Sequence, residues 1–190
     1  KTFASQVLMQ IKDKPISFEV FSDDFEEMYV QALEISSWGT NVFVKIPITN
    51  SKGESSKDVI RKLSHQGVKL NITAILTLEQ VRETLDVLEP MTPSYISIFA
   101  GRIADTGYDP VPMMSAAVDF LKVAPAAELI WASPRELLNV IQAEQIGCHV
   151  ITATSDILKK LDLIGKDLTQ YSLETVQMFR MDALDSGYSI

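Results

Sequence analysis

The chain has 190 residues, of which 46% are hydrophobic and 22% charged, as expected for one domain of a soluble protein. The formal net charge of −8 excludes the basic surface that nucleic acid or an anionic membrane requires, so we expect neither as a partner. A single cysteine excludes an internal disulfide, and the two histidines lie in separate segments without ligand spacing, so we expect neither a metal nor a cofactor.

Residues 1–15 have the pattern of an amphipathic helix and not of a signal peptide. No stretch of the sequence reaches the ~20 apolar residues of a membrane span, so we expect a cytoplasmic protein. Six short apolar runs follow, each rich in the Ile, Val and Phe of buried parallel strands. They are 16–20, 42–47, 69–75, 95–100, 128–133 and 149–154.

Helical patterns separate these runs. One opens with Thr77 followed by Gln80, the spacing of a capping box, and the terminal pattern covers 172–187. Strict alternation of strand and helix predicts an α/β protein with parallel strands, and we find no break that would divide 1–190 into two domains. No glycine-rich loop follows a strand, which excludes a dinucleotide fingerprint and a P-loop. An open doubly wound sheet and a closed (β/α) barrel both remain.

Polar side chains recur on one face of the predicted strands. Because side chains alternate along a strand, Lys45 shares a face with Phe43, opposite Val44 and Ile46. Five strands show an aliphatic face and a second face that carries polar residues near the carboxyl end. These polar residues are Glu19, Lys45, Asn71, Thr73, Ser97 and Ser133, the last on the face that we assign to Trp131 and opposite Ile130 and Ala132. In a barrel the polar face points inward and its carboxyl end holds the active site, so the pattern favours the barrel.

Lys45 is the most informative of these residues, because burying an isolated ammonium group is costly. One interpretation is a structural ion pair with Glu19 on the neighbouring strand, although desolvation offsets most of the stability that such a pair gives. The other is a Schiff-base lysine. Desolvation disfavours the charged ammonium, so a free amine that attacks a carbonyl becomes available near neutral pH.

Four stretches of the sequence together resemble the transaldolase family of class I aldolases. They are VFVKIPIT (42–49), GVKLNITAILTLEQ (67–80), YISIFAGRIADTGYDP (95–110) and LIWASPRE (129–136). The resemblance extends from about residue 16 to the C-terminus, with the stretches in the family's order and at short spacings. It implies an eight-stranded TIM-type barrel and an enzyme that binds small sugar phosphates, in the pentose phosphate pathway.

The resemblance also implies roles for single residues. Lys45 is expected to be the Schiff-base lysine, and Glu19 with Thr73 to position a catalytic water. Asn71, Ser97 and Phe99 are expected to contact the substrate, although Asn71 and Ser97 also suit a structural place inside the barrel. The remaining matches are Arg102, Ser133 and Arg135, which are expected to hold the substrate phosphate, as guanidinium groups do. A solvated surface position is the alternative for the two arginines.

Two positions separate the branches of the family. The fructose-6-phosphate aldolase branch has Gln where this chain has Glu19 and Tyr where it has Phe99. The resemblance therefore implies a transaldolase, which transfers a dihydroxyacetone unit from a ketose phosphate to an aldose phosphate. Small members of the family form rings, so we expect a homo-oligomer, in which the helix and tail of 172–190 lie on a neighbour or on their own barrel.

The sequence departs from the family at its start. The family's first two strands carry an LDT-like motif with a catalytic Asp and a TTNP-like motif with an Asn, and neither motif occurs here. We therefore expect a barrel that lacks its first one or two β/α units in this chain. Two alternatives to a transaldolase remain, namely a lyase like fructose-6-phosphate aldolase and an inactive sugar-phosphate-binding barrel.

Overall fold

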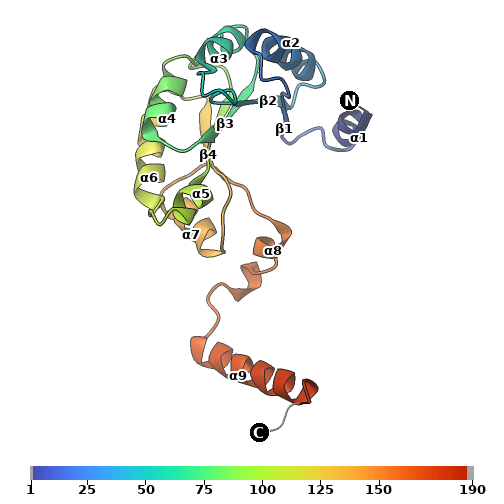
Figure 1. Ribbon diagram of the computed structural model, residues 1–190, viewed down its shortest axis with the longest axis vertical. Helices are drawn as coiled ribbons and strands as arrows, with labels where there is room; N and C mark the ends of the chain where they lie inside the picture. Colours follow the sequence, from blue (N-terminus) through green and yellow to red (C-terminus); the bar gives the residue numbers. More distant parts are fainter. Residues whose placement is uncertain (1, 188–190) are drawn as a thin grey trace. The chain divides into compact units, whose positions relative to one another are not determined.

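The computed structural model describes residues 2–187 of the chain, which divides into two compact units, 1–153 and 154–190 (Figure 1). The strands are β1 (Ile16–Glu19), β2 (Val42–Pro47), β3 (Leu70–Ile75), β4 (Ser94–Ile98), β5 (Ala127–Trp131) and β6 (Val150–Ile151), all in the first unit. The helices of that unit are α1 (Thr2–Gln10), α2 (Phe25–Ser36), α3 (Lys57–Ser64), α4 (Leu78–Leu85), α5 (Ala100–Asp105), α6 (Val111–Phe120) and α7 (Leu138–Gln145), and a short 3-10 helix spans Leu121–Val123. The second unit holds α8 (Ser155–Leu158), a 3-10 helix at Leu161–Leu163 and α9 (Leu168–Asp185).

The six strands form one parallel sheet in the order β1-β2-β3-β4-β5-β6. A doubly wound sheet reverses its strand order at a switch point, whereas a (β/α) barrel adds each strand beside the one before. The unbroken order is therefore that of a half-barrel. Figure 1 shows α2, α3, α4 and α6 in an arc along the outer side of these strands.

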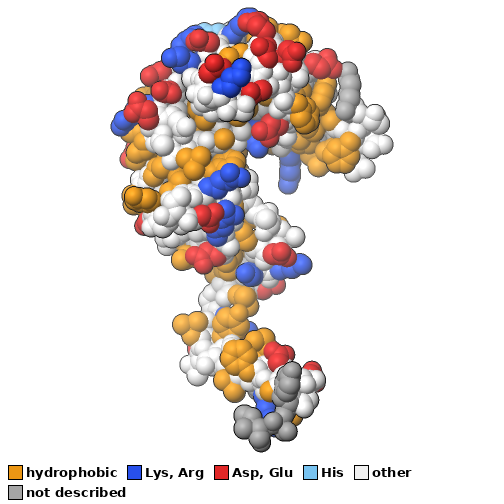
Figure 2. All heavy atoms as spheres, viewed as in Figure 1, with side chains coloured by type: hydrophobic (Ala, Val, Ile, Leu, Met, Phe, Trp, Pro, Cys, Tyr) orange, Lys and Arg blue, Asp and Glu red, His pale blue; other side chains and the backbone are white. Residues whose placement is uncertain are grey.

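Local capping signals place the helices that cover the sheet. The Asp24 side chain accepts hydrogen bonds from the backbone N–H groups of Glu26 and Glu27 at the start of α2. Thr77 and Gln80 form the predicted capping box at the start of α4. Acidic and basic side chains are interspersed over the outer helices in Figure 2, so charged residues cover the side of the helices that faces solvent.

The main core lies between the outer face of the sheet and the helices. The aliphatic side chains that the alternation assigned to this face in β2, β3 and β4 are completely or almost completely buried. They are Val42, Val44, Ile46, Leu70, Ile72, Ile96 and Ile98. Burial of each such side chain contributes about 1.5–3 kcal/mol. The same burial directs the polar residues of these strands to the inner face.

The face assigned to β5 is wrong. Trp131 is completely buried in the outer core, while Ile130 and Ala132 line the inner face. The reason is the register, which pairs Ser97 of β4 with Ile130, because paired residues of parallel strands share a face. Ser133 still reaches the inner face because it follows the strand with a left-handed backbone, φ 60°.

The last predicted elements have different bounds in the structure. β6 contains two residues and not the expected 149–154, and it pairs with β5 alone among the described strands. The terminal helix begins at Leu168 and not at residue 172. Residues 188–190 of the predicted tail lie outside the described residues. None of the helices within 2–187 is long and apolar enough to cross a membrane.

Candidate active site

The carboxyl ends of the strands surround a hollow of about 440 Å³ on the inner face, which we call the inner hollow. It is lined by Ser17, Lys45, Asn71, Thr73, Ser97, Phe99, Ile130, Ala132, Ser133 and Thr152. Six residues singled out from the sequence therefore meet in one place, namely Lys45, Asn71, Thr73, Ser97, Phe99 and Ser133. The other three, Glu19, Arg102 and Arg135, are not part of this lining.

Lys45 stands between Glu19 of β1 and Asn71 of β3, because both are its register partners. Its Nζ lies 3.3 Å from Oε2 of Glu19, so the ion pair considered above is formed. The Lys45 side chain is 29% exposed and the Glu19 side chain 49%, because the pair lies beside the edge strand and at the open end of the hollow. Lys45 is therefore less buried than we expected, but it does lie beside a carboxylate.

Asn71 is held by hydrogen bonds at both ends of its amide group. The Ser97 hydroxyl donates to Asn71 Oδ1 at 2.7 Å, and Asn71 Nδ2 donates to Ser17 Oγ at 2.9 Å. Asn71 and Ser97 are both buried. Ser17 was not singled out from the sequence, although its place two residues before Glu19 on the same strand puts it on the polar face.

Thr73 has a buried hydroxyl without a protein partner. The residue is 2% exposed, and its Oγ1 makes no hydrogen bond to any described residue. The described residues have two other buried atoms of this kind, Ser56 Oγ and Trp131 Nε1, and neither residue lines the inner hollow. Since buried polar groups nearly always have a partner, the Thr73 hydroxyl is suited to bind a water or a ligand group in the hollow.

Two strained backbone positions lie at this end of the sheet. Ala74 and Ser133 have φ values of 62° and 60°, which residues with a side chain rarely adopt. The Ser133 carbonyl also approaches Gly101 so closely that a Cβ at position 101 would lie 1.5 Å from its oxygen. The start of α5 and the loop after β5 are thus packed together, and strain of this type collects at functional sites.

Neither arginine lines the inner hollow, and each has a partner of its own. Arg135 binds Asp105 with two hydrogen bonds, Nε to Oδ1 at 3.0 Å and Nη2 to Oδ2. These bonds lower the pKa of Asp105 and raise that of Arg135. The Arg102 guanidinium lies 5.3 Å from the centre of the Phe99 ring. Asp105 was also missed in the sequence, although its spacing of three residues from Arg102 on one helix was a signal.

Thr152 also lines the inner hollow but was not predicted from the sequence. Its Oγ1 accepts a hydrogen bond from the Ser133 N–H at 3.2 Å.

A second hollow, of about 510 Å³, is larger than the inner hollow. Apolar side chains from Leu76 to Met113 dominate its lining, which contains no lysine or arginine. The described residues include no group of three or more His, Cys, Asp or Glu side chains that could hold a metal ion. The chemistry therefore points to the inner hollow.

Comparison with known proteins assigns the chain to a family. The family model described as transaldolase/fructose-6-phosphate aldolase matches residues 2–187. The chain belongs to this family. It is 32% identical over 184 residues to a protein named "Probable transaldolase" from Thermoanaerobacter, covering 96% of this chain and 79% of that relative. A protein of the same name from Streptococcus equi subsp. zooepidemicus is 35% identical over 155 residues, covering 81% of this chain and 69% of the relative.

The fold of this transaldolase-family chain also resembles that of a more distant enzyme. A mandelate oxidase variant carrying an FMN adduct superposes with a TM-score of 0.56 at 14% identity, over 78% of this chain. The chain spans 50% of the length of that oxidase chain. At this identity the likeness concerns the fold alone.

Proposed function

We propose that the protein is a transaldolase that transfers a dihydroxyacetone unit between sugar phosphates through a Schiff base on Lys45. The observation that supports this most strongly is the place of the Lys45 amine. It lies 3.3 Å from the Glu19 carboxylate, beside a hollow at the carboxyl ends of parallel strands. Membership of the transaldolase/fructose-6-phosphate aldolase family supports the same chemistry.

The proposed reaction begins when the neutral Lys45 amine attacks the ketose carbonyl carbon. The carbonyl oxygen takes up protons and leaves as water, and an imine forms. A base takes the proton of the C4 hydroxyl, whose oxygen becomes the new carbonyl, while the C3–C4 bond breaks and its electron pair passes to the protonated imine. An aldose phosphate is released and an enamine remains. The enamine then adds to the carbonyl carbon of an acceptor aldose phosphate, whose oxygen takes up a proton, and water hydrolyses the new imine to restore the amine.

Glu19 and Thr73 are the proposed centre of proton transfer. Glu19 lies within reach of Lys45 Nζ, and the unpartnered Thr73 hydroxyl lines the same hollow. A water held by both would carry protons to and from the imine. Asn71, Ser97 and Phe99 are proposed to contact the substrate from the floor and wall of the hollow. Because the chain departs from the family at its first two strands, we also propose that these six strands belong to an eight-stranded barrel.

The substrate phosphate is proposed to bind near Arg102, Ser133 and Arg135. Guanidinium groups bind phosphate through paired hydrogen bonds. Asp105 engages the Nε and Nη2 side of Arg135, so a phosphate would be bound through the other side of that guanidinium. Arg102 lies beside Phe99, which does line the inner hollow.

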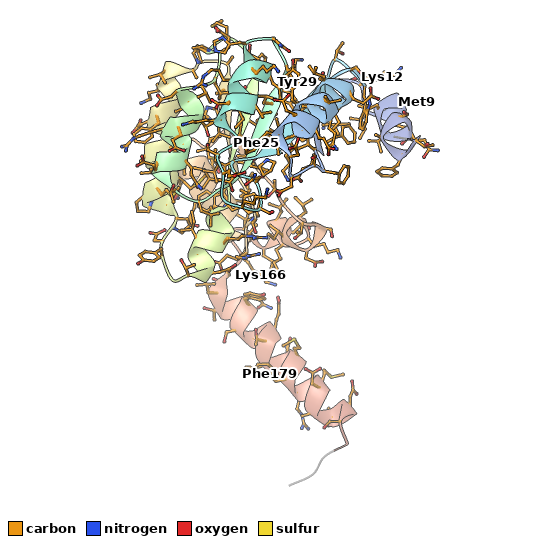
Figure 3. All side chains as sticks on the ribbon, turned by 45° about the horizontal axis from the view of Figure 1, so that its top comes forward. Met9, Lys12, Phe25, Tyr29, Lys166 and Phe179 are labelled. Carbon is orange, nitrogen blue, oxygen red and sulfur yellow. The ribbon has the colours of Figure 1, made fainter. Side chains whose placement is uncertain are left out.

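A homo-oligomer is the proposed assembly. Apolar side chains along α9 are largely exposed, among them Leu168, Leu173, Val176 and Phe179, and Figure 3 shows Phe179 on this helix. An exposed apolar helix of this kind is typical of a surface that binds another chain. This function implies small sugar phosphates as substrates. It also implies a role in the pentose phosphate pathway and a place in the cytoplasm.

The test is covalent trapping. Fructose 6-phosphate and borohydride should add a reduced dihydroxyacetone unit to Lys45, located by peptide mass mapping. Lys45→Met should abolish the label and turnover while circular dichroism stays unchanged, and Lys57→Met, an exposed lysine at the start of α3, should leave both at wild-type level. Label on another lysine, or none on the wild-type chain, would refute the proposal.

The lyase alternative is favoured by the family description, which includes fructose-6-phosphate aldolase. It is distinguished by product analysis without an acceptor. A lyase releases free glyceraldehyde 3-phosphate over many turnovers, whereas a transaldolase stops after one equivalent. Glu19 and Phe99 support the second outcome. Sugar-phosphate binding without any label would identify the inactive barrel.

A further inference from the structure

A chain of hydrogen bonds crosses the inner face below Lys45. It begins at Ser97 on β4, passes through the amide of Asn71 on β3, and ends at the Ser17 hydroxyl on β1. The two bonds measure 2.7 Å and 2.9 Å, within the range of good hydrogen bonds. Neither of the terminal serines bonds directly to Lys45 in the structure.

The bond between Asn71 and Ser17 spans the strand that carries Lys45. β1 and β3 are not neighbours, since β2 lies between them. Asn71 is the register partner of Lys45, whereas Ser17 is the partner of Phe43, two residues before Lys45. The Asn71 amide therefore lies across β2 on the amino-terminal side of Lys45, where the floor of the inner hollow is.

We propose that Ser17 is a positioning residue for the reaction, which it serves by fixing the plane of the Asn71 amide. This inference rests on the proposed function. Oδ1 is engaged by Ser97 and one Nδ2 hydrogen by Ser17, so the second Nδ2 hydrogen remains as a donor whose direction the two serines define. A donor held in advance stabilises oxygen atoms that gain charge as the imine forms and breaks down.

The chemistry of the hollow explains why both serines are needed. With Ser97 alone, the amide can rotate about its remaining hydrogen bond and about χ2, a torsion with a broad minimum. The second Nδ2 hydrogen of Asn71 then points away from the ligand for part of the time. A lost neutral hydrogen bond of this type corresponds to about a two- to tenfold effect, and we expect it mainly in kcat, because the donor acts on the reacting atoms.

The test compares Ser17→Ala with Ser17→Thr. Ser17→Ala should lower kcat about two- to tenfold with KM changed less than about twofold, and Ser17→Thr, which keeps the hydroxyl, should restore most of kcat. In an Asn71→Ala background Ser17→Ala should have no further effect, since both act through one amide. Phe18→Leu is the matched control, because it weakens β1 on the opposite face, where Phe18 packs on Trp38 at 5.4 Å.

A spectroscopic measurement tests the positioning directly. The two side-chain amide protons of Asn71 should shift in the NMR spectrum of Ser17→Ala and exchange faster with solvent, while Ser17→Thr keeps the wild-type pattern. Unchanged Asn71 resonances, additive effects of Ser17→Ala and Asn71→Ala, or an equal loss of kcat in Phe18→Leu would overturn the inference. A wild-type chain that traps no substrate on Lys45 would instead refute the proposed function, and the kinetic role of Ser17 with it.

Discussion

Single residues of the site are placed by register and by their neighbours, and Lys45 shows this most clearly. The sequence left open whether Lys45 pairs with Glu19 or is a free amine, and the structure forms the pair and leaves the Lys45 side chain 29% exposed. Arg135, in the loop after β5, is likewise placed by a partner, Asp105 at the end of α5. Lys45 and Arg135 therefore each have an acidic partner, whereas Arg102 lies beside the Phe99 ring.

The pair of Asp105 and Arg135 predicts an acid-dependent part of the stability. Because the pKa of Asp105 is lowered below its ordinary value of 3.8, the contribution is complete above that pH and is lost as the pH falls through the folded pKa. Asp105→Asn should thus lower the free energy of unfolding above this pH, and the difference from wild type should shrink in stronger acid. Denaturant titrations at several pH values measure it.

An exposed ion pair contributes little to the free energy of unfolding. The test therefore relies on the sign of the difference between wild type and Asp105→Asn and on its dependence on pH. Asp119→Asn is a suitable control, because Asp119 forms an exposed pair with Lys122 on the outer surface. A difference between wild type and Asp105→Asn that grows on acidification would contradict the assignment.

Among the elements, the start of α5 and the loop after β5 hold the strand ends together. Gly101 N–H donates to the Ala132 carbonyl, and Ala132 N–H donates to the Ile98 carbonyl. No side chain fits at Gly101 because the Ser133 oxygen is in the way. The left-handed backbone of Ser133 belongs to the same arrangement. The geometry of the proposed phosphate site thus depends on one glycine.

Gly101→Ala should therefore destabilise the protein by about 2 kcal/mol or more, because α5 or the loop that carries Ser133 must move. Gly67→Ala provides the comparison. Gly67 has φ +78° but no heavy atom within 4 Å of an added Cβ, so it should lose only about 1 kcal/mol from backbone strain. Thermal and denaturant unfolding give both values. Equal losses would show that the contact with Ser133 is not rigid.

The elements also show how far the sequence predicts this fold. All six strands were found, and the period of two assigned the correct faces in β2, β3 and β4. β5 failed because LIWAS has apolar residues on both faces, so that its pattern does not distinguish the side of Trp131 from that of Ile130. The pairing of Ser97 with Ile130 decides it, and pairing is a long-range contact.

For the whole molecule, the exposed apolar side chains of α9 bear on the number of chains in the assembly. α9 has eighteen residues and no buried side chain, so it gains little stability from the rest of its own unit. We predict that light scattering shows a mass above that of one chain. The double variant Leu173→Glu and Phe179→Glu should reduce that mass, whereas Gln177→Glu, on the same helix, should not.

A monomeric wild-type chain over the micromolar range would contradict the proposed oligomer. It would leave the half-barrel and the inner hollow unaffected, because all their residues lie in the first unit. Trapping on Lys45 and the mass of the assembly are thus independent measurements.

Local periodicity was enough to predict the parallel α/β class and the polar face with Lys45, Asn71, Thr73 and Ser97. The folded chain was needed to show which of these side chains meet and how Lys45 is paired. It was also needed to find the contacts that Ser17, Asp105 and Thr152 make with Asn71, Arg135 and Ser133. The difference arises from separation along the chain. Periodicity acts over a few residues, whereas strand register and loop conformation result from contacts between residues that lie many positions apart.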